Sequence, residues 1–463
     1  MARINPETVE NLRKAQLIEE KIKAANPEKI AHSKELQSRM GNVRGRPLLY
    51  SMFPSGRGSG PFFESEDGSV KMDLICGIGV ALFGYHHPEI FRESLEGLSR
   101  APFMHGTLMP GHDHLQLSEK VLAAANGDGL GHLSSEARAK MAGVWLTSCG
   151  TMANELALKI LRQKHSPKFK LISFKGAFAG RSTAMQELTD EAKYREGQPT
   201  FDQFAHIPFF DDRGSVEQNV KKTLDELKRL LDQDEFAGLG FEPIQGEGGA
   251  FRQAPRLWWT AVLEFVKKQG LAVWFDEVQS FGRTGEFFAY QKLGLGQFVD
   301  VLSVAKPLQC GAVLWSKDYA PKPGLIAGTF SGSGAALASG AKILDLLREG
   351  SYLGPSGKIA ALEKMIIADW AERRERLGEK FGLGKMNISG GMIACEVLDG
   401  KAETIKALLN AMFEKGVLAF SAGKEPVCLR FLPPMGVLIE AHWKLAMKVM
   451  EESLEEVKNV SST

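Results

Sequence analysis

The sequence lacks the features of disulfide-rich, membrane and secreted proteins. Its five cysteines are an odd number scattered over 463 residues, and none forms a C-x-x-C pair. This usage argues against a disulfide framework or a zinc site and favours the reducing cytoplasm. No uninterrupted apolar run approaches the roughly 18 residues that suggest a membrane-spanning helix. The opening residues, MARINPETVENLRKAQ, contain no apolar stretch of the kind that a secretory signal has.

An excess of charge of one sign is also missing. The chain has 57 Lys and Arg against 56 Asp and Glu, and the two signs are mixed along its length. No basic block offers the charge that nucleic-acid binding needs, so we expect no nucleic-acid partner. What is present is an ordinary soluble composition, with 44% hydrophobic and 24% charged residues, in a chain long enough for two or three domains. These observations leave a large cytoplasmic enzyme or binding protein.

The middle of the chain alternates strand-sized apolar runs with helical stretches. The apolar runs are 143–147, 170–174, 238–244, 271–277 and 300–306. They lack polar alternation, which is typical of strands buried on both faces of a mostly parallel sheet. Helical patterns lie between them, as in ANELALKILRQK after the first run. The alternation predicts an α/β domain whose helices cover the sheet.

The pattern changes near residue 336 to long helices, followed by short strands around 391–431 and a closing helix near 440–458. We therefore predict three parts. Residues 71–335 form a large cofactor-binding domain with a mostly parallel sheet. Residues 336–463 form a smaller α+β domain, and residues 1–70 pack with it.

Polar residues follow three of the apolar runs, at the sheet edge where α/β proteins bind ligands. The turn 148–151 opens a helix, whose free N–H groups and positive dipole end suit a phosphate. The run 271–277 ends in Asp276 and Glu277, and a buried acid there either holds a cationic ligand atom, caps a helix or pairs with an arginine such as Arg283. Lys306 ends the next run and is either a solvated lysine or a nucleophilic amine.

Together these three features match the needs of pyridoxal phosphate. The carboxylate would keep the pyridine nitrogen protonated, and the lysine would hold the aldehyde as an imine and later move a proton. No G-x-G-x-x-G follows a strand and no G-x-x-x-x-G-K-[ST] occurs, so competing cofactors have no support. An alternative is the acyl-transferase pattern S-x-x-K formed by Ser303 and Lys306, although its companion motifs SDN and KTG are absent.

The same residues lie in segments that resemble the class III (omega) aminotransferases of pyridoxal-phosphate fold type I. The resemblance runs from about 70 to 435. Its segments are DLICGIGVALFGYHHPEI, SCGTMANE, GAFAGRS, EPIQGEGG, FDEVQSFGRTGEFFA, VLSVAKPLQCG, GTFSG and LRFLPP, in that order. Ala179 stands where the family usually has His. The Q-C-G ending at 309–311 is most similar to the lysine 6-aminotransferase branch, with the 4-aminobutyrate enzymes as relatives.

The resemblance implies cofactor-binding roles. Lys306 would form the Schiff base and move the proton, and Asp276 would pair with the pyridinium nitrogen. Gln279 would hydrogen-bond the ring hydroxyl, and Phe178 would stack on the ring. The set is completed by the phosphate donors Gly150 and Thr151 and by Thr329. Thr329 is expected to reach the phosphate of the neighbouring subunit, so a homodimer with active sites at its interface is expected.

The resemblance also implies the substrates. Arg181 and Arg430 look like two carboxylate-binding arginines, which suit a dicarboxylate. Glu247 aligns with a gate glutamate that pairs with the C-terminal arginine. The implied reaction moves the terminal amino group of lysine, 4-aminobutyrate or ornithine onto 2-oxoglutarate. Alternatives with the same fold are an aminomutase, racemase or decarboxylase, and an alternative of another class is a non-catalytic cofactor-binding protein.

One histidine-rich segment, HGTLMPGHDH at 105–114, has a metal-like composition. Because it is rich in Gly and Pro, we expect a loop and no metal site.

Overall fold

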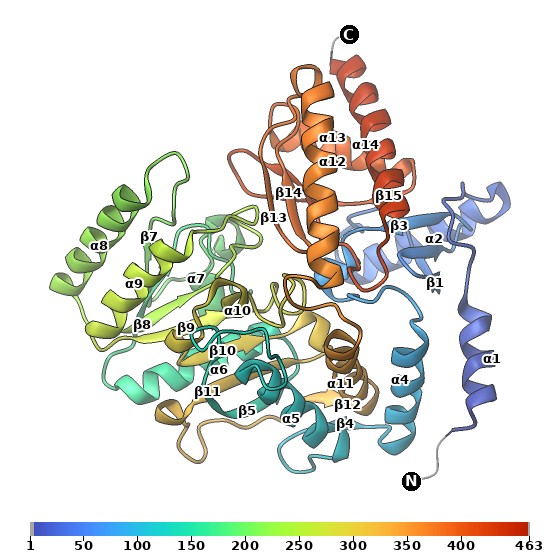
Figure 1. Ribbon diagram of the computed structural model, residues 1–463. Helices are drawn as coiled ribbons and strands as arrows, with labels where there is room; N and C mark the ends of the chain where they lie inside the picture. Colours follow the sequence, from blue (N-terminus) through green and yellow to red (C-terminus); the bar gives the residue numbers. More distant parts are fainter. Residues whose placement is uncertain (1–3, 462–463) are drawn as a thin grey trace. The chain divides into compact units, whose positions relative to one another are not determined.

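The computed structural model describes residues 4–461 and, among them, the side chains up to residue 459. The chain forms two compact units. Unit 1 comprises Met1–Leu95 and Lys358–Thr463, and unit 2 comprises Glu96–Gly357. The domain boundaries that we placed at residues 70 and 335 stay a prediction. Figure 1 shows their helices and strands.

Unit 2 contains a seven-stranded sheet (Figure 1). Its strands are β5 (Met141–Thr147), β6 (Lys170–Phe174), β7 (Phe204–Ile207), β8 (Phe236–Phe241), β9 (Ala272–Asp276), β10 (Val301–Val304) and β11 (Gly311–Ser316). Their order across the sheet is β5-β11-β10-β9-β8-β6-β7. Only β11 runs against its neighbours. The mostly parallel α/β fold predicted from the sequence is confirmed, and all five predicted strands are present.

The helices of unit 2 pack on both faces of this sheet. Their bounds are α5 (His112–Asn126), α6 (Gly150–His165), α7 (Thr183–Leu188), α8 (Val216–Gln233), α9 (Arg256–Lys268), α10 (Ala289–Leu293) and α11 (Gly334–Glu349), with α4 (Pro88–Arg100) spanning the division between the units. Successive strand residues point to opposite faces. Trp274 of β9 shares a core cluster with the leucines of α6, whereas Phe275 packs in an aromatic cluster that includes Trp259 of α9. Asp276 therefore lies on the α6 face.

The α9 face is held by large buried aromatic side chains. Phe241 of β8 stacks on Trp259 with ring centroids 4.5 Å apart, and Phe174 of β6 meets the same ring edge-on. Trp258 and Trp259 are both fully buried. Burial of this much aromatic surface holds α9 against the parallel strands of the sheet.

Unit 1 contains two four-stranded sheets. Their strands are β1 (Pro54–Ser59), β2 (Phe62–Ser65), β3 (Val70–Asp73) and β15 (Val417–Leu418), and then β13 (Met386–Ser389), β14 (Met392–Cys395), β17 (Cys428–Phe431) and β16 (Phe420–Ala422). Helices α1 (Pro6–Gln16), α2 (Pro27–Arg44), α3 (Cys76–Gly79), α12 (Lys358–Phe381), α13 (Ala402–Glu414) and α14 (Glu440–Ser461) complete it. The pairing of β3 with β15 joins the N-terminal and C-terminal parts of the chain in one unit.

One expectation about local structure is wrong. The segment 105–114 is not a loop throughout, because His105 belongs to the short strand β4 (Met104–His105), which pairs with β12 (Gly332–Ser333), and His112 begins α5. Asp113 lies in the first turn of that helix and pairs with Arg100, at 2.6 Å. An acid is favoured there by the helix dipole, a signal that the Gly and Pro around it obscured.

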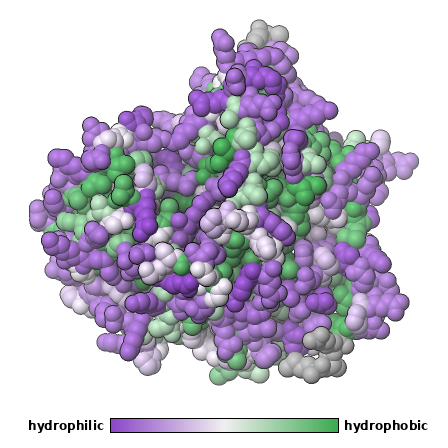
Figure 2. Space-filling view, viewed as in Figure 1, coloured by the Kyte–Doolittle hydropathy of each residue, from purple (hydrophilic) through white to green (hydrophobic). Residues whose placement is uncertain are grey.

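The surface face drawn in Figure 2 is mostly hydrophilic, with smaller hydrophobic areas. Among the helices that the structure describes, none has the length and apolar content needed to cross a membrane.

Candidate active site

The ends of β9 and β10 bring the predicted carboxylate and lysine onto neighbouring strands. Ser303 of β10 pairs in parallel register with Asp276 of β9, and the N–H of Glu277 donates to the Ser303 carbonyl at 2.9 Å. Lys306 follows three residues later and opens a short 3-10 turn. Its φ of 55° lies in the left-handed region, which is uncommon for a residue with a side chain and is often found at functional sites.

Asp276 is buried, and its carboxylate is held by two donors. One oxygen accepts from the N–H of Val278 at 2.9 Å, and the other accepts from the side-chain amide of Asn154 at 2.7 Å. Burial raises the pKa of Asp276 to about 6, while these two hydrogen bonds and the positive charge of Lys306 oppose the rise. The carboxylate is thus fixed in place and costly to ionise, so a cationic ligand atom would stabilise its charged form.

Glu277 does not share this role. Its fully buried carboxylate accepts from the N–H groups of Ala289 at 2.9 Å and Tyr290 at 2.8 Å, and from the hydroxyl of Ser280. Ala289 and Tyr290 form the first turn of α10, so Glu277 caps that helix. Of Asp276, the last residue of β9, and Glu277, which follows it, the helix-cap interpretation applies to Glu277.

The N-terminus of α6 lies against the same strand ends. Cys149 precedes the helix without a side-chain cap among the described residues, so the first N–H groups are available for an anion. A Cβ on Gly150 would lie 2.7 Å from Val278 and 3.3 Å from Ala305, the residue before Lys306. A Cβ on Gly180 would lie 2.4 Å from the Thr151 hydroxyl. Gly150 and Thr151 therefore lie close to the segments that carry the acid, the lysine and Arg181.

Gln279 ends in a buried amide oxygen that has no hydrogen-bond partner among the described residues. An unpaired buried acceptor is costly, so a donor on a bound ligand would complete this site. A Cβ on Gly246 would lie 2.6 Å from this oxygen and 2.9 Å from a carboxylate oxygen of Glu242. The absence of a side chain at Gly246 leaves room for both polar groups.

The sequence interpretation missed Glu242. This buried acid follows β8, just as Asp276 ends β9, so the rule used for Asp276 would have found it. Its carboxylate accepts from the N–H groups of Phe178 at 3.0 Å and Gly246 at 2.9 Å. Burial and, next, the negative charge of Asp276 raise the pKa of Glu242 to about 8. Through the hydrogen bond from Phe178, Glu242 links the segment that carries Phe178 to the end of β8.

Phe178 and Arg181 lie on one segment with a second aromatic residue beside them. The Phe178 ring meets Tyr194 edge-on, with centroids 6.2 Å apart, and the Arg181 guanidinium lies 3.9 Å from the centre of the Tyr194 ring. Phe178 is half-buried and Arg181 is exposed. Tyr194 was also missed by the sequence interpretation, and no local pattern around it pointed to this contact.

The remaining predicted residues lie elsewhere. Thr329 is exposed in a groove of unit 2 with a volume of about 580 Å³, where the hydroxyl of Thr107 donates to the carbonyl of Gly328. Glu247 is half-buried and also belongs to unit 2. Arg430 is fully buried in β17 of unit 1, with its guanidinium 5.1 Å from the centre of the Phe420 ring. The roles of these three residues stay predictions.

The acyl-transferase alternative receives no structural support. Ser303 is fully buried, and its hydroxyl accepts from the indole N–H of Trp274 at 2.9 Å, so it is not placed to act as an acyl-transferring nucleophile. Within residues 4–461 no group of three or more His, Cys, Asp or Glu side chains is arranged to hold a metal ion. His105 instead accepts from the N–H of Gly111 at 2.9 Å.

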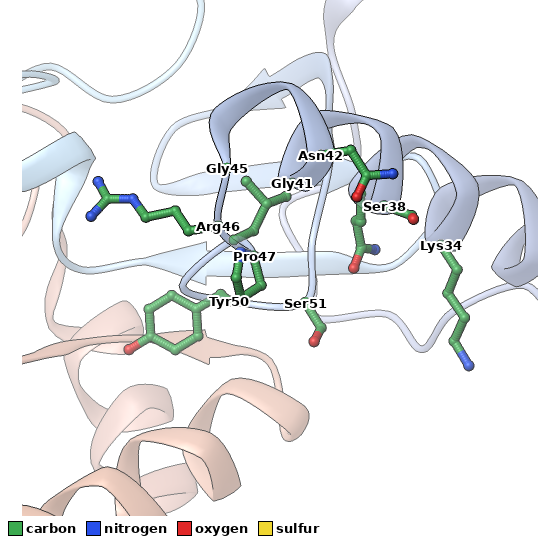
Figure 3. A pocket seen from close by; sticks show the side chains of 11 residues that line it. Lys34, Ser38, Gly41, Asn42, Gly45, Arg46, Pro47, Tyr50 and Ser51 are labelled. Atoms are coloured by element: carbon green, nitrogen blue, oxygen red, sulfur yellow. The ribbon is translucent and has the colours of Figure 1, made fainter.

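A separate pocket of about 660 Å³ lies in unit 1 between the end of α2 and the segment that follows it (Figure 3). Lys34 and Arg46 supply its positive charges, and Tyr50 lies at its border with its hydroxyl donating to the Ala419 carbonyl at 2.6 Å. Among the described residues, its lining includes none of the predicted site residues.

The groups at the sheet edge of unit 2 fit pyridoxal phosphate. The aldehyde needs an amine, the ring nitrogen an anionic partner, the ring hydroxyl an acceptor and the phosphate a cluster of N–H donors. Lys306, Asp276, Gln279 and the start of α6 offer these groups, and the orphaned oxygen of Gln279 supports a ligand on grounds independent of the motif. Fold and site together define a pyridoxal-phosphate enzyme of fold type I.

Comparison with known proteins identifies the family. Residues 44–454 match the class-III aminotransferases. Acetylornithine aminotransferase 1 of Bradyrhizobium diazoefficiens is 30% identical over 392 residues, covering 82% of this chain and 86% of that protein. The diaminobutyrate–2-oxoglutarate aminotransferase of Rhizobium meliloti is 28% identical, covering 86% of this chain and 87% of that protein. The chain therefore belongs to the class-III aminotransferase family.

The fold comparison agrees. Lysine aminotransferase from M. tuberculosis, in its internal aldimine form, has a TM-score of 0.77 at 20% sequence identity, covering 91% of this chain and 99% of that chain. The resemblance noted in the sequence is confirmed: the protein is a pyridoxal-phosphate-dependent aminotransferase, and hence a transferase.

Proposed function

We propose that this aminotransferase moves the terminal amino group of an omega-amino donor onto 2-oxoglutarate, giving a semialdehyde and glutamate. The donor class includes lysine, ornithine, 4-aminobutyrate and, from the names of the relatives, acetylornithine and diaminobutyrate. The observation that carries the proposal is the buried Asp276 carboxylate at the end of the strand beside the one that leads to Lys306. We further propose that the protein works in the cytoplasm, in line with its scarce, unpaired cysteines.

The residues divide the work of amino transfer. Bound pyridoxal phosphate supplies an aldehyde that takes up the amino group and a ring that accepts an electron pair. Asp276 holds a proton on the ring nitrogen, because its anionic form is stabilised by that positive charge. Lys306 carries a proton at its Nζ between the two carbon positions that exchange it. Phe178 would pack on the face of the cofactor ring and restrict its movement, and the N–H groups of Gly150 and Thr151 would bind the phosphate.

Substrate recognition rests on Arg181 and Arg430. Each guanidinium can make a bidentate, charge-assisted pair with a carboxylate, so the two together suit 2-oxoglutarate. A donor with a single carboxylate needs only one of them. Glu247 would then pair with Arg430 and remove an uncompensated charge from the site, so that one pocket serves both substrates in turn.

We propose a homodimer in which Thr329 reaches the phosphate of the partner subunit. Support comes from the groove that contains Thr329, because its rim is unusually apolar for a surface. Leu108 is 93% exposed, Met109 is 65% exposed and Phe103 is more than half exposed. Phe330, next to Thr329 in the chain, is also more than half exposed. A second copy of the chain would cover this surface.

The test is the absorption spectrum of the purified holoenzyme, recorded while each candidate amine is added without a keto acid. A conversion of the cofactor band by one amine, reversed by 2-oxoglutarate, is expected and names the donor. A band that every amine leaves unchanged contradicts the proposed transfer. Repeated turnover without any keto acid, giving many equivalents of product per active site, would instead indicate an aminomutase, racemase or decarboxylase.

A further inference from the structure

Tyr194 forms part of an arrangement that no motif of the sequence marks. It lies in the 3-10 turn Ala192–Arg195, just beyond the segment 176–182 that carries Phe178 and Arg181. Its ring contacts both of these side chains: the Arg181 guanidinium lies over its face at 3.9 Å, and Phe178 meets it at an interplanar angle of 89°. One ring therefore links the predicted cofactor-stacking residue to the predicted carboxylate-binding residue.

The backbone beneath these side chains is held at several points. The N–H of Gly176 donates to the Asp190 carboxylate at 2.8 Å, and the N–H of Asp190 donates to the Ala177 carbonyl at 2.9 Å. The hydroxyl of Thr189 accepts from the N–H of Ala179 at 2.9 Å and donates to the carbonyl of Gly180 at 3.1 Å. The segments 176–180 and 189–190 thus form one hydrogen-bonded layer.

This layer continues to the turn that carries Tyr194. The guanidinium of Arg195 donates to the Thr189 carbonyl at 3.1 Å, and the N–H of Tyr194 donates to the Glu191 carbonyl at 3.1 Å. Because the backbone on both sides is anchored, the Tyr194 ring is a fixed platform. The Arg181 side chain, which is exposed, would otherwise lose considerable rotamer freedom on binding a substrate.

Stacking on a ring restrains a guanidinium without using its hydrogen-bonding edge. A guanidinium that lies face-on over a ring keeps its in-plane N–H groups free in the fork that matches a carboxylate, and the Arg181 Cζ lies 3.9 Å from the centre of the Tyr194 ring. We infer that Tyr194 is a positioning residue that pre-orients Arg181 for a substrate carboxylate. The inference rests on the proposed function, in which Arg181 binds a substrate carboxylate, and it adds that this recognition depends on an aromatic platform outside the family segments.

The experiment measures binding of glutarate, an unreactive dicarboxylate, to the holoenzyme by calorimetry. Replacement of the ring in Tyr194→Leu should weaken glutarate binding about 2- to 5-fold, the range expected for an exposed cation–π contact. Tyr194→Phe keeps the ring and should restore most of the affinity. In steady-state assays, Tyr194→Leu should raise KM for 2-oxoglutarate by a similar factor and leave kcat nearly unchanged.

Two controls separate orientation of Arg181 from a general loss of structure. Phe201→Leu removes an exposed aromatic side chain nearby in the sequence and should leave glutarate binding unchanged. In an Arg181→Met background, Tyr194→Leu should have no further effect on glutarate binding. Equal glutarate affinity in the wild type and Tyr194→Leu, an equal loss in the Leu and Phe variants, or no glutarate binding by the wild type would each overturn the inference.

The glutarate measurement involves no turnover, so its outcome is separate from that of the proposed function. An enzyme that binds glutarate through Tyr194 and Arg181 but converts no amine would refute the proposed reaction alone. An enzyme that transaminates with no dependence on the Tyr194 ring would refute the positioning role alone.

Discussion

The substitution Asp276→Asn should stabilise the cofactor-free protein while it removes activity. Asp276 is buried, and its pKa is raised from 3.8 to about 6 in the folded chain. A carboxyl group that binds its proton more tightly when folded destabilises the folded state once pH exceeds its unfolded pKa. This destabilisation grows by about 1.4 kcal/mol for each pH unit between the unfolded and the folded pKa. Above the folded pKa it is complete, at about 3 kcal/mol.

Asparagine carries no charge and avoids this cost, but it introduces an opposing one. Its amide would direct an N–H group either at the amide nitrogen of Asn154 or at the N–H of Val278, both of which donate to Asp276 in the wild type. Loss of one such hydrogen bond costs about 1 kcal/mol and does not depend on pH. The informative quantity is therefore the change with pH of the difference in unfolding free energy between variant and wild type.

That difference should grow in favour of Asp276→Asn by about 1 to 1.5 kcal/mol from about pH 5 to about pH 8, and level off above the folded pKa. Urea unfolding of the two cofactor-free proteins, followed by tryptophan fluorescence, measures it. Glu242 and Glu277 have raised pKa values of about 8 and about 7 in the wild type, and burial, the main cause for both, is present in both proteins. The part of each rise that the charge of Asp276 causes is lost in the variant, which adds to the growth of the difference in the same direction. A difference that stays constant with pH would refute the reasoning.

With the cofactor bound, the same variant should lose at least about 100-fold in turnover, because nothing then holds the proton on the ring nitrogen. Stability gained and activity lost in one substitution would be the signature of a functional charge.

The remaining predictions concern three other positions. Lys306→Ala should abolish turnover and remove the imine absorption band of the holoenzyme; near-normal activity would contradict the assignment of the lysine. Gly150→Ala should raise the dissociation constant of pyridoxal phosphate at least about tenfold, because the new Cβ would lie 2.7 Å from Val278 and displace the helix start. Fluorimetric titration with the cofactor measures this constant. Unchanged affinity would argue against a phosphate at this helix end. Ser303→Ala should keep amino transfer but lower the free energy of unfolding by about 1 to 3 kcal/mol, because the buried indole N–H of Trp274 loses its acceptor. Loss of activity in a variant of normal stability would instead support a catalytic role for this serine.

The strands that carry the site could be recognised from the sequence because strands buried on both faces have a distinctive local composition. Strands enclosed on both faces need continuous apolar residues, so β9 and β10 could be recognised, and with them the acid and the lysine at their ends. The same logic extends to Glu242, which lies inside the predicted run 238–244 and directly follows β8 in the structure. The family segments supplied the remaining assignments.

Apart from the family segment, nothing local indicated which of Asp276 and Glu277 would face the ligand. That choice follows from tertiary structure, because Asn154 of α6 reaches Asp276 while the first turn of α10 captures Glu277. In the same way, only the structure shows that Asp113, in the first turn of α5, pairs with Arg100, 13 residues earlier.

By itself, the sequence determined the alternation of strands and helices, the reactive groups at the strand ends and the family. Only the tertiary structure decided the environment of those groups: how strongly burial raises the pKa of Asp276, that the buried amide oxygen of Gln279 has no partner among the described residues, and that the Arg181 guanidinium lies over the Tyr194 ring. The physical reason is range. Strand and helix patterns arise from neighbours along the chain, whereas desolvation, hydrogen-bond satisfaction and ring stacking depend on groups that the fold brings together from distant positions.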